Sequence, residues 1–296
     1  MEAAYWWGAV IGALVGAAVG VGGTALYKGA VAAFVAQMKG PRTWTACGGS
    51  AMFSVLLSGM ALLVFAMEGL VCLPMAAPLI VGLALLGSWL GWLAGGGKTQ
   101  SGAQLALPSI GVLALAVGGG SILPAPDSSG EVTTVWHLFA PPERLWPHVL
   151  ALPSLPEPDW WLFRLGVAYP LRSETKPDGA RTCDLSTGPM PEIVTRRDEY
   201  RRLAFRVIKT PPSMRELNPF GKVHASHLTS VYRGKEGEFL LSPEGSGTLL
   251  IARSSYGLRM GPFWYWRLWP DSIVSHVHER VVQEIERRSS FDSIGR

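Results

Sequence analysis

The sequence predicts an N-terminal all-α transmembrane bundle of about four helices, followed by a C-terminal α+β domain. The charge distribution is the first reason, because residues 1–125 hold four basic and two acidic side chains out of 26 and 22 in the chain. The second reason is that β-branched and aromatic runs follow after residue 125, and the chain closes on an amphipathic helical pattern. The first part therefore has the composition of a membrane protein and the second that of a soluble domain.

The expected membrane region covers residues 1–123. A helix needs about 20 apolar residues to cross a bilayer. Four segments meet this requirement, at 5–26, 50–72, 77–95 and 103–123. The first segment is not typical of a signal peptide, because it lacks a basic start and its apolar run is long.

Glycine recurs at every fourth residue of the first segment, at Gly8, Gly12, Gly16 and Gly20. This spacing places a flat stripe along one helix face, where a neighbouring backbone can approach closely. Packing within the bundle is the favoured interpretation, and a homo-oligomer formed through the stripe is the alternative.

Basic residues in the loops predict the orientation. Lys28, Lys39 and Arg42 lie between the first two spans, and Lys98 lies between the last two. The positive-inside rule places both loops in the cytoplasm. We therefore expect a multi-pass protein of a bacterial-type cell membrane, with the bilayer as its partner and the C-terminal domain extracytoplasmic.

Glu68 is the acid embedded in the apolar stretch VFAMEGLVCLPM. Intramembrane acids are functional candidates by default. Its place near the expected outer end of the second span favours snorkelling, or pairing with the C-terminal domain, over transport. Its role stays open.

Cysteine spacing and charge exclude several classes of protein. Cys47 and Cys72 are expected at opposite ends of one span, too far apart for a disulfide, and Cys183 lies far along the chain. No spacing is typical of a metal site. Each part has a net charge of +2, without the basic excess of a nucleic-acid binder. We expect no cofactor, no metal and no nucleic acid.

The C-terminal region divides into a linker at 124–130 (PAPDSSG), a domain at 131–290 and a tail at 291–296. EVTTVWHLFA predicts a first strand and APPERLWPHVLAL a short helix with prolines in its first turn. A helix is expected at about 271–290. The other expected strands lie at about 180–186, 190–197, 199–209, 223–233, 236–242 and 246–257.

Strand alternation separates two faces within YRRLAFRVIK. Leu203 and Phe205 point to one side, while Arg202 and Arg206 point to the other. The arginines most simply form a solvated face, and recruitment of anionic lipid headgroups is the alternative.

The terminal helix carries a histidine on its apolar stripe. At about 100° per residue, His278 falls among Val274, Val281 and Ile285, whereas His276 falls on the polar face. A helical metal chelate needs residues i and i+4, so this pair does not predict a metal site. His278 is either a core histidine satisfied by a carbonyl or a hydroxyl such as that of Tyr256, or the polar anchor of an apolar cavity.

Several separate blocks of the C-terminal part point to one family. They are TPPSMREL (210–217), HASHL (224–228), GEFLL (237–241), GTLL (247–250), Tyr256 and PFWYWRLWPDSIVSHVHERVV (262–282). With these blocks the domain resembles the membrane-anchored branch of the SRPBCC superfamily, the START-like helix-grip proteins often labelled polyketide-cyclase-like. The upstream stretch EGLVCLPMAAP (68–78) is similar to the membrane signature of that branch.

The resemblance implies a curved antiparallel sheet that grips the C-terminal helix, with a hydrophobic tunnel between them. Two residues depart from the pattern. Pro270 predicts a kink or a late start of the helix, and Arg253 stands where the family tends to carry a small polar residue. The residues that match the family by position are Asp271, His278 and Arg280 in the helix, and Glu216, His224 and His227 before it.

Our first hypothesis is a non-enzymatic, membrane-anchored protein that binds a hydrophobic small molecule or lipid in a START-like cavity. The three tryptophans before the helix could line its mouth or lie in the headgroup layer, where Trp is enriched. The candidate cavity residues are His278, Tyr256, Trp264, Trp266, Trp269, Phe205, Val274, Val281, Ile285 and His227.

Two alternatives remain because a fold does not determine a function. One is a cyclase- or hydrolase-like enzyme acting on an aromatic or polyketide-like substrate, with His278, Glu216, His224 or His227 as acid or base. No motif of an activated nucleophile supports it, since GxSxG, HExxH, the P-loop and the dinucleotide fingerprint do not occur. The other is a non-catalytic interaction module of a membrane complex.

Overall fold

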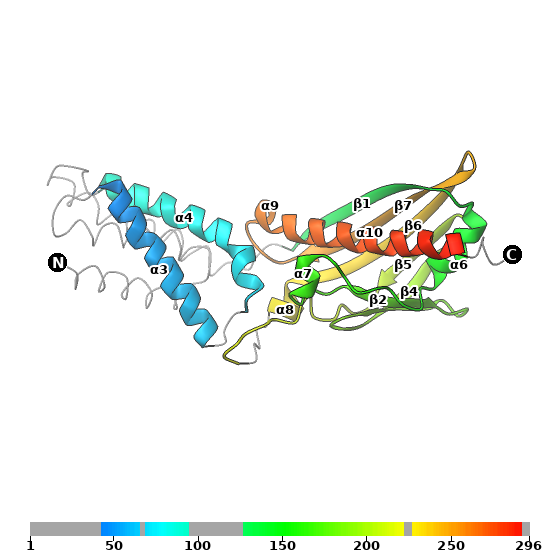
Figure 1. The fold of residues 1–296 in the computed structure, drawn as a ribbon, viewed down its shortest axis with the longest axis horizontal. Coiled ribbons are helices and arrows are strands. Elements are labelled where there is room, and N and C mark those ends of the chain that lie inside the picture. The colour runs from blue at the N-terminus through cyan, green and yellow to red at the C-terminus, as the bar shows by residue number, and fades with distance from the viewer. Residues whose placement is uncertain (1–42, 66–68, 95–126, 222–226, 292–296) are drawn as a thin grey trace. The chain divides into compact units, whose positions relative to one another are not determined.

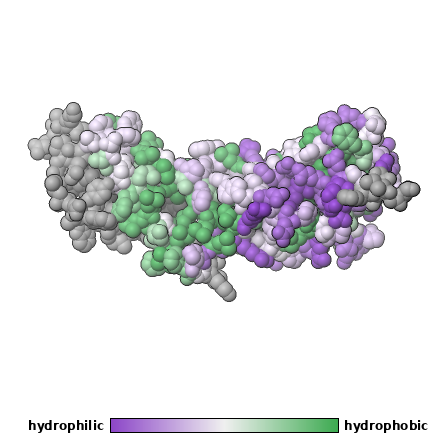
Figure 2. Space-filling model, viewed as in Figure 1, coloured by the Kyte–Doolittle hydropathy of each residue, from purple (hydrophilic) through white to green (hydrophobic). Residues whose placement is uncertain are grey.

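The chain forms two compact units. The computed structural model describes residues 43–65, 69–94, 127–221 and 227–291. One unit, here the helical unit, contains Met1–Pro124 and Leu217–His224, and the other, the sheet unit, contains Ala125–Glu216 and Ala225–Arg296. Hydrophobic side chains gather over the described part of the helical unit, while hydrophilic ones dominate the surface of the sheet unit (Figure 2).

The helical unit contains α3 (Trp44–Val64) and α4 (Cys72–Ala94). Both are long and apolar enough to cross a membrane. The described residues thus contain two candidate spans where about four were expected in the whole region. The expected spans at 5–26 and 103–123, with their glycine stripe, lie outside the described residues.

The boundaries of these two helices differ from the expected ones. α3 ends at Val64 rather than at residue 72, and α4 already begins at Cys72. Pro74 lies in the first turn of α4, where a missing backbone N–H costs little because it has no intrahelical partner. Cys47 and Cys72 therefore lie on different helices, which corrects the expectation of one shared span. Glu68 lies outside the described residues.

One antiparallel sheet of seven strands organises the sheet unit. Its spatial order is β1-β7-β6-β5-β4-β3-β2, so the first strand pairs with the last and the remaining neighbours follow chain order. The strands are β1 (Ser128–Leu138), β2 (Pro170–Thr175), β3 (Ala180–Leu185), β4 (Gly188–Asp198), β5 (Arg202–Val207), β6 (Tyr232–Glu244) and β7 (Gly247–Leu258).

A long C-terminal helix, α10 (Leu268–Phe291), lies along the face of the curved sheet (Figure 1). It contacts both β1 and α6. This arrangement fits the helix-grip fold that the sequence predicts. The shorter helices of the unit are α6 (Pro142–Leu150), α7 (Trp161–Arg164), α8 (His227–Ser230) and α9 (Phe263–Trp266).

Three local features differ from the expected elements. Three residues of the expected linker, Ser128–Gly130, already belong to β1, because they pair with Tyr256–Leu258 of β7. β2 was not expected, since its sequence PLRSET has no apolar alternation and the strand forms by pairing with β3. The strand expected at 223–233 is wrong at 227–230, where α8 forms, and its last two residues belong to β6, which begins at Tyr232.

Pro270 marks the late start that the sequence predicts, because α10 does not continue back through the tryptophans of α9. The helix begins at Leu268, so Pro270 occupies its first turn, and only Arg267 separates it from α9. A continuous helix would need an N–H at Pro270 to reach the carbonyl of Trp266. The missing donor explains why the break between the two helices falls here.

Two groups of buried apolar side chains lie between the sheet and the helices. The main core cluster joins the inward faces of the strands to α6 and the C-terminal half of α10, with Leu203, Leu250 and Ile285 among its fully buried members. The second cluster contains Val132, Tyr256, Leu258 and Val274. The inner and outer faces of β5 follow the predicted alternation, because Leu203 is buried and Arg206 is exposed.

Candidate functional site

His278 is a buried polar residue on the inward face of α10, among Val274, Val281 and Ile285. Its side chain is buried, and its residue is only 4% exposed. Nδ1 lies 2.8 Å from Oγ1 of Thr134 on β1, and Nε2 lies 2.8 Å from Oγ of Ser254 on β7. The helix is thus tied through one imidazole to two neighbouring strands. We call these three residues the imidazole cluster.

The hydroxyl partners indicate which nitrogen carries the proton. Thr134 donates its hydroxyl hydrogen to the carbonyl of Ala252 at 3.4 Å, so its oxygen is left to accept from Nδ1–H of His278. The Ser254 hydroxyl then donates to Nε2. Burial lowers the pKa of His278 to about 4, so the imidazole is neutral at neutral pH. The cluster is therefore polar but uncharged.

Tyr256 forms a separate polar contact at the N-terminal end of α10. Its ring is fully buried, and its hydroxyl donates to Oδ1 of Asp271 at 2.5 Å. Asp271 also accepts from Nε of Arg267 at 3.0 Å. Burial and the bond to Asp271 raise the pKa of Tyr256. The hydroxyl of Tyr256 therefore does not satisfy His278; the hydroxyls of Thr134 and Ser254 do so, as in the core-histidine alternative.

A buried ion pair lies on the inner face of β3 and β4. Nε of Arg181 is 2.9 Å from Oε2 of Glu192, and the two side chains are 5% and 1% exposed. Arg181 also donates to the Leu150 carbonyl at 3.1 Å and to Thr175 Oγ1 at 2.6 Å. Burial raises the pKa of Glu192 to about 7 although Arg181 opposes the shift. The pair connects the strands to the C-terminal end of α6.

Glycines make room for two aromatic rings of the interior. A Cβ on Gly130 would lie 2.3 Å from the Tyr256 ring, and one on Gly237 would lie 2.4 Å from the Phe205 ring. The guanidinium of Arg181 stands 4.9 Å from the centre of the Phe205 ring. Close backbone approach therefore positions both rings.

The structure brings most of the predicted cavity residues to the interior, but not to one spot. Phe205, Val281 and Ile285 belong to or pack on the main core cluster. Tyr256, Val274 and Trp266 belong to or pack on the second cluster. His278 lies on α10 between Val274 and Val281, and it separates the two apolar regions along the helix.

The remaining predicted residues lie elsewhere. Trp264 is 66% exposed, so it does not line the interior. Trp269 is partly buried, and its Nε1 has no acceptor among the described residues. His227 is the first residue of α8. His224 lies outside the described residues, and Glu216 follows the short bridge between Val167 and Met214.

The sequence interpretation missed several partners. Thr134 and Ser254 were not singled out, although each alternates in register with inward apolar residues of its strand. The same signal was available for Arg181, which shares a strand face with Cys183. His276 was expected on a polar face, but its ring stacks on Trp160 at 3.8 Å between centroids.

Arg202, Arg206 and Arg253 lie on the outer face of the sheet and are paired. Arg202 forms an ion pair with Glu238, which also lies 3.6 Å from Arg253. Arg206 lies 3.6 Å from Glu236. Arg253 therefore leaves the polarity of the interior unchanged. Within the described ranges, no group of three or more His, Cys, Asp and Glu side chains is arranged to hold a metal ion.

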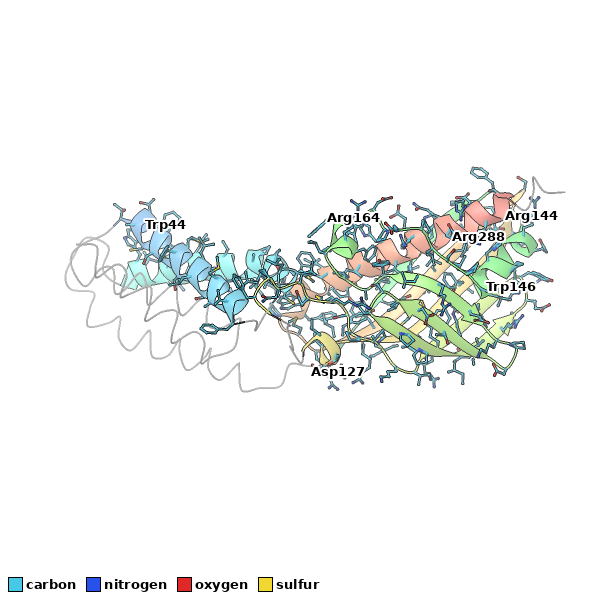
Figure 3. The ribbon with its side chains drawn as sticks, turned by 60° about the horizontal axis from the view of Figure 1, so that its bottom comes forward. Trp44, Asp127, Arg144, Trp146, Arg164 and Arg288 are labelled. Carbon is cyan, nitrogen blue, oxygen red and sulfur yellow. The ribbon has the colours of Figure 1, made fainter. Side chains whose placement is uncertain are left out.

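The C-terminal end of α10 and the helix α6 close one end of the sheet unit. Figure 3 shows Trp146 on α6 and Arg288 near the end of α10 at this end. Arg288 binds the buried Glu284 at 2.5 Å and the Ser154 carbonyl at 3.0 Å. Trp146 is 3% exposed and packs in the main core cluster. The pair with Glu284 orients Arg288 within α10, and the bond to Ser154 ties the end of the helix to the segment after α6.

Comparisons with known proteins give a limited result. No protein-family model matches the chain. No curated protein sequence matches it either.

Solved structures align with the C-terminal part at low identity. Protein TTHA0849 from Thermus thermophilus is 16% identical over 55% of this chain and 99% of that chain, with a TM-score of 0.31. Truncated norcoclaurine synthase from Thalictrum flavum is 10% identical over 56% and 96%, with a TM-score of 0.33. Protein SA2116 from Staphylococcus aureus is 9% identical over 56% and 97%, with a TM-score of 0.36. Identities and TM-scores this low assign no activity, and the fold rests on the strand order and helix position of the chain itself.

Proposed function

We propose that the protein is a membrane-anchored binding protein for a hydrophobic molecule, most simply a lipid, held between the sheet and α10. The imidazole cluster is the observation that carries this proposal. It is one uncharged polar group on an apolar helix face, with an apolar cluster on either side. Ligand sites are typically apolar with a few placed polar groups.

The charge state of the cluster narrows the ligand chemistry. The neutral imidazole and the two hydroxyls use their hydrogens within the cluster and on the Ala252 carbonyl, so only hydroxyl lone pairs remain to accept from a ligand hydroxyl, and the cluster supplies no counter-charge. A buried carboxylate or ammonium without a partner would cost far more than a neutral polar group. The proposed ligand is therefore mainly apolar, with a small neutral head.

Membrane anchoring is the second part of the proposal. It is supported by α3 and α4, which have the length and hydropathy of membrane spans. A tether keeps a lipid-binding domain near its supply and raises the effective concentration of the ligand. The extracytoplasmic orientation, from the basic loops, and oligomerisation through Gly8, Gly12, Gly16 and Gly20 belong to the same proposal.

Native mass spectrometry of the full-length protein, extracted gently from its own membranes, tests the binding. We expect a defined lipid in stoichiometric amount. His278→Ala and Trp266→Ala should lose it, because both residues touch the interior. His137→Ala and Trp264→Ala are matched controls, since those side chains lie exposed, and should retain it. Empty protein, or bulk phospholipid equally present in all variants, would favour the interaction module instead.

An enzymatic function is the second candidate, because His278 is hydrogen-bonded to the Ser254 hydroxyl through one ring nitrogen and to the Thr134 hydroxyl through the other. This arrangement matches that of nucleophile, base and orienting group in hydrolases. Two facts weigh against it. The lowered pKa makes His278 a weak base, and a hydroxyl in the third place cannot stabilise an imidazolium as a carboxylate does.

Turnover of activated esters by the full chain separates the two candidates. An enzyme would lose turnover in Ser254→Ala while retaining bound ligand. A binding protein would show no turnover above the no-protein rate in any variant.

A further inference from the structure

A short segment of the C-terminal half belongs to the helical unit. Leu217–His224 groups with that unit, and it is described as far as Gly221. The N–H of Leu70 donates to the carbonyl of Leu217 at 2.9 Å, and Nδ2 of Asn218 donates to the carbonyl of Leu63 at 3.0 Å. Leu63 lies in the last turn of α3, and Leu70 lies in the connection to α4. Asn218 and Leu63, 155 positions apart in the chain, are thus hydrogen-bonded at one end of the helix pair.

These bonds satisfy two backbone groups near the C-terminal end of α3, the carbonyl of Leu63 and the N–H of Leu70. The last four carbonyls of a helix lack the regular i+4 donor, Leu63 is among these residues of α3, and Asn218 supplies a side-chain donor to its carbonyl. Asn218 is itself held, because its Oδ1 accepts from the N–H of Phe220 at 2.8 Å. Polar backbone groups left unsatisfied near the hydrocarbon of a bilayer are unfavourable, because no water is there to bond them. A capping amide is therefore most valuable where a span meets the interface.

The side chains around these bonds are apolar and exposed. Phe65 is 74% exposed and Phe220 is 59% exposed, and Leu70 and Leu217 are exposed beside them. We call these four residues the interface patch. No charged residue occurs in 217–221, which reads LNPFG. The patch continues an exposed apolar row along α3, formed at helical spacing by Leu56, Met60 and Val64.

The length of α3 indicates how deep in a bilayer the interface patch would lie. α3 has 21 residues, which is about 32 Å at about 1.5 Å per residue and close to the hydrocarbon thickness of about 30 Å. If α3 spans, its C-terminal end lies at the boundary between acyl chains and headgroups. Large apolar side chains exposed at that depth are covered by lipid rather than water.

We propose that Leu217–Gly221 is a second membrane anchor, with Leu217 and Phe220 inserted into the bilayer beside the α3–α4 connection. The proposal rests on the membrane anchoring proposed above. It attaches the chain to the membrane between β5 and α8, in addition to the spans. The C-terminal half of the chain then contacts lipid directly, through the side chains of Leu217 and Phe220.

Site-specific photocrosslinking of the full chain in its own membranes tests this. The photoreactive amino acid p-benzoylphenylalanine replaces one residue at a time. Phe220 is the test position and Phe65 the reference for the end of α3. Ile208 is the matched control, because it is a 62% exposed apolar residue of the sheet unit. Adducts are identified by mass spectrometry as lipid, second copy or internal crosslink.

We expect lipid adducts at positions 65 and 220, each several-fold above position 208. Lipid at 65 without lipid at 220 would overturn the second anchor and leave the spans in place. A crosslinked dimer at 220 would overturn it in favour of an interface between copies. Lipid at neither position would overturn both the anchor and the proposed membrane anchoring.

Discussion

Two buried titratable side chains of the sheet unit, His278 and Glu192, have shifted pKa values. His278 is held neutral because burial lowers its pKa, and it depends on two hydroxyls for its hydrogen bonds. Burial raises the pKa of Glu192. As the pH rises, the contribution of His278 to folding stability therefore increases, whereas that of Glu192 decreases.

The stability contribution of His278 should depend on pH. Its pKa is about 4 in the folded chain and 6.5 ordinarily, so the unfolded chain binds the proton more tightly between these values. The contribution is complete above pH 6.5 and is lost as the pH falls toward 4. The loss amounts to about 3 kcal/mol, from about 1.36 kcal/mol per pKa unit.

Thermal midpoints in detergent, measured from pH 7 to pH 4, check this expectation. The difference in thermal midpoint between the wild type and His278→Gln should shrink as the pH falls, because glutamine has no group that is protonated in this range. Glu192 acts oppositely, lowering stability as the pH rises from 4.5 to 7, and it is present in both proteins. Parallel pH profiles would show that His278 is not buried in its neutral form.

Two glycines should resist even the smallest substitution. Gly130→Ala and Gly237→Ala would each drive a Cβ into an aromatic ring. Overpacking of this kind costs about 1–3 kcal/mol, which lowers the thermal midpoint by roughly 2–4 °C per kcal/mol in a domain of this size. Gly234→Ala is the control, because its Cβ would make ordinary contacts from 3.5 Å. Equal midpoints for all three variants would contradict the close approach.

At the scale of elements, polar contacts fix how the helices meet the sheet. The imidazole cluster joins α10 to β1 and β7, while the Arg181–Glu192 pair joins β3 and β4 to the end of α6. Tyr256 and Asp271 fix the N-terminal end of α10. Apolar packing alone is non-directional, so these bonds define the position of each helix along the sheet.

The buried ion pair should behave as a unit. Arg181→Met leaves Glu192 buried without its partner and should cost about 3 kcal/mol. Adding Glu192→Gln removes the uncompensated acid, so the double variant should be more stable than Arg181→Met alone. Hydrogen exchange of the β3 and β4 amides measures these local free energies.

The exposed pair of Arg196 with Asp198, at 2.8 Å, is the control. Arg196→Met should change the same free energies by less than about 0.5 kcal/mol. Additive effects of Arg181→Met and Glu192→Gln would contradict the coupling.

At the scale of the whole molecule, the two units differ in what their surfaces contact. Large apolar side chains stand exposed along α3 and α4, whereas the strands of the sheet unit expose paired charges. The first surface is typical of contact with lipid and the second of contact with water. The proposed anchoring therefore depends on the helical unit.

A charge placed on α3 should weaken membrane insertion. Leu56→Asp puts a carboxylate near the centre of the helix, where it costs about 2.5–3.5 kcal/mol. Leu171→Asp is the control, on an exposed leucine of the sheet unit. After an alkaline carbonate wash, the wild type and the control should stay in the membrane pellet, and Leu56→Asp should be partly released. Release of the wild type would argue against a membrane span.

Much of this could be predicted from the sequence because it depends on local periodicity. The inward position of His278 follows from its place among Val274 and Val281, and the faces of β5 follow from alternation. The partners could not be predicted in the same way. Thr134 and Ser254 lie 144 and 24 residues from His278 and meet it only when β1 pairs with β7.

By itself, the sequence determined the two compositional parts of the chain, the apolar helix stripe and the strand-rich character of the C-terminal part, because apolar periodicity and charge are properties of neighbouring residues. Only the tertiary structure decided that β2 is a strand, that Pro270 lies inside the first turn of α10 and that Arg181 finds Glu192 across two strands. It also decided that Asn218 caps α3. β2, the ion pair and the cap each depend on a partner in another element, whose hydrogen bond or packing outweighs the local preference of the residue.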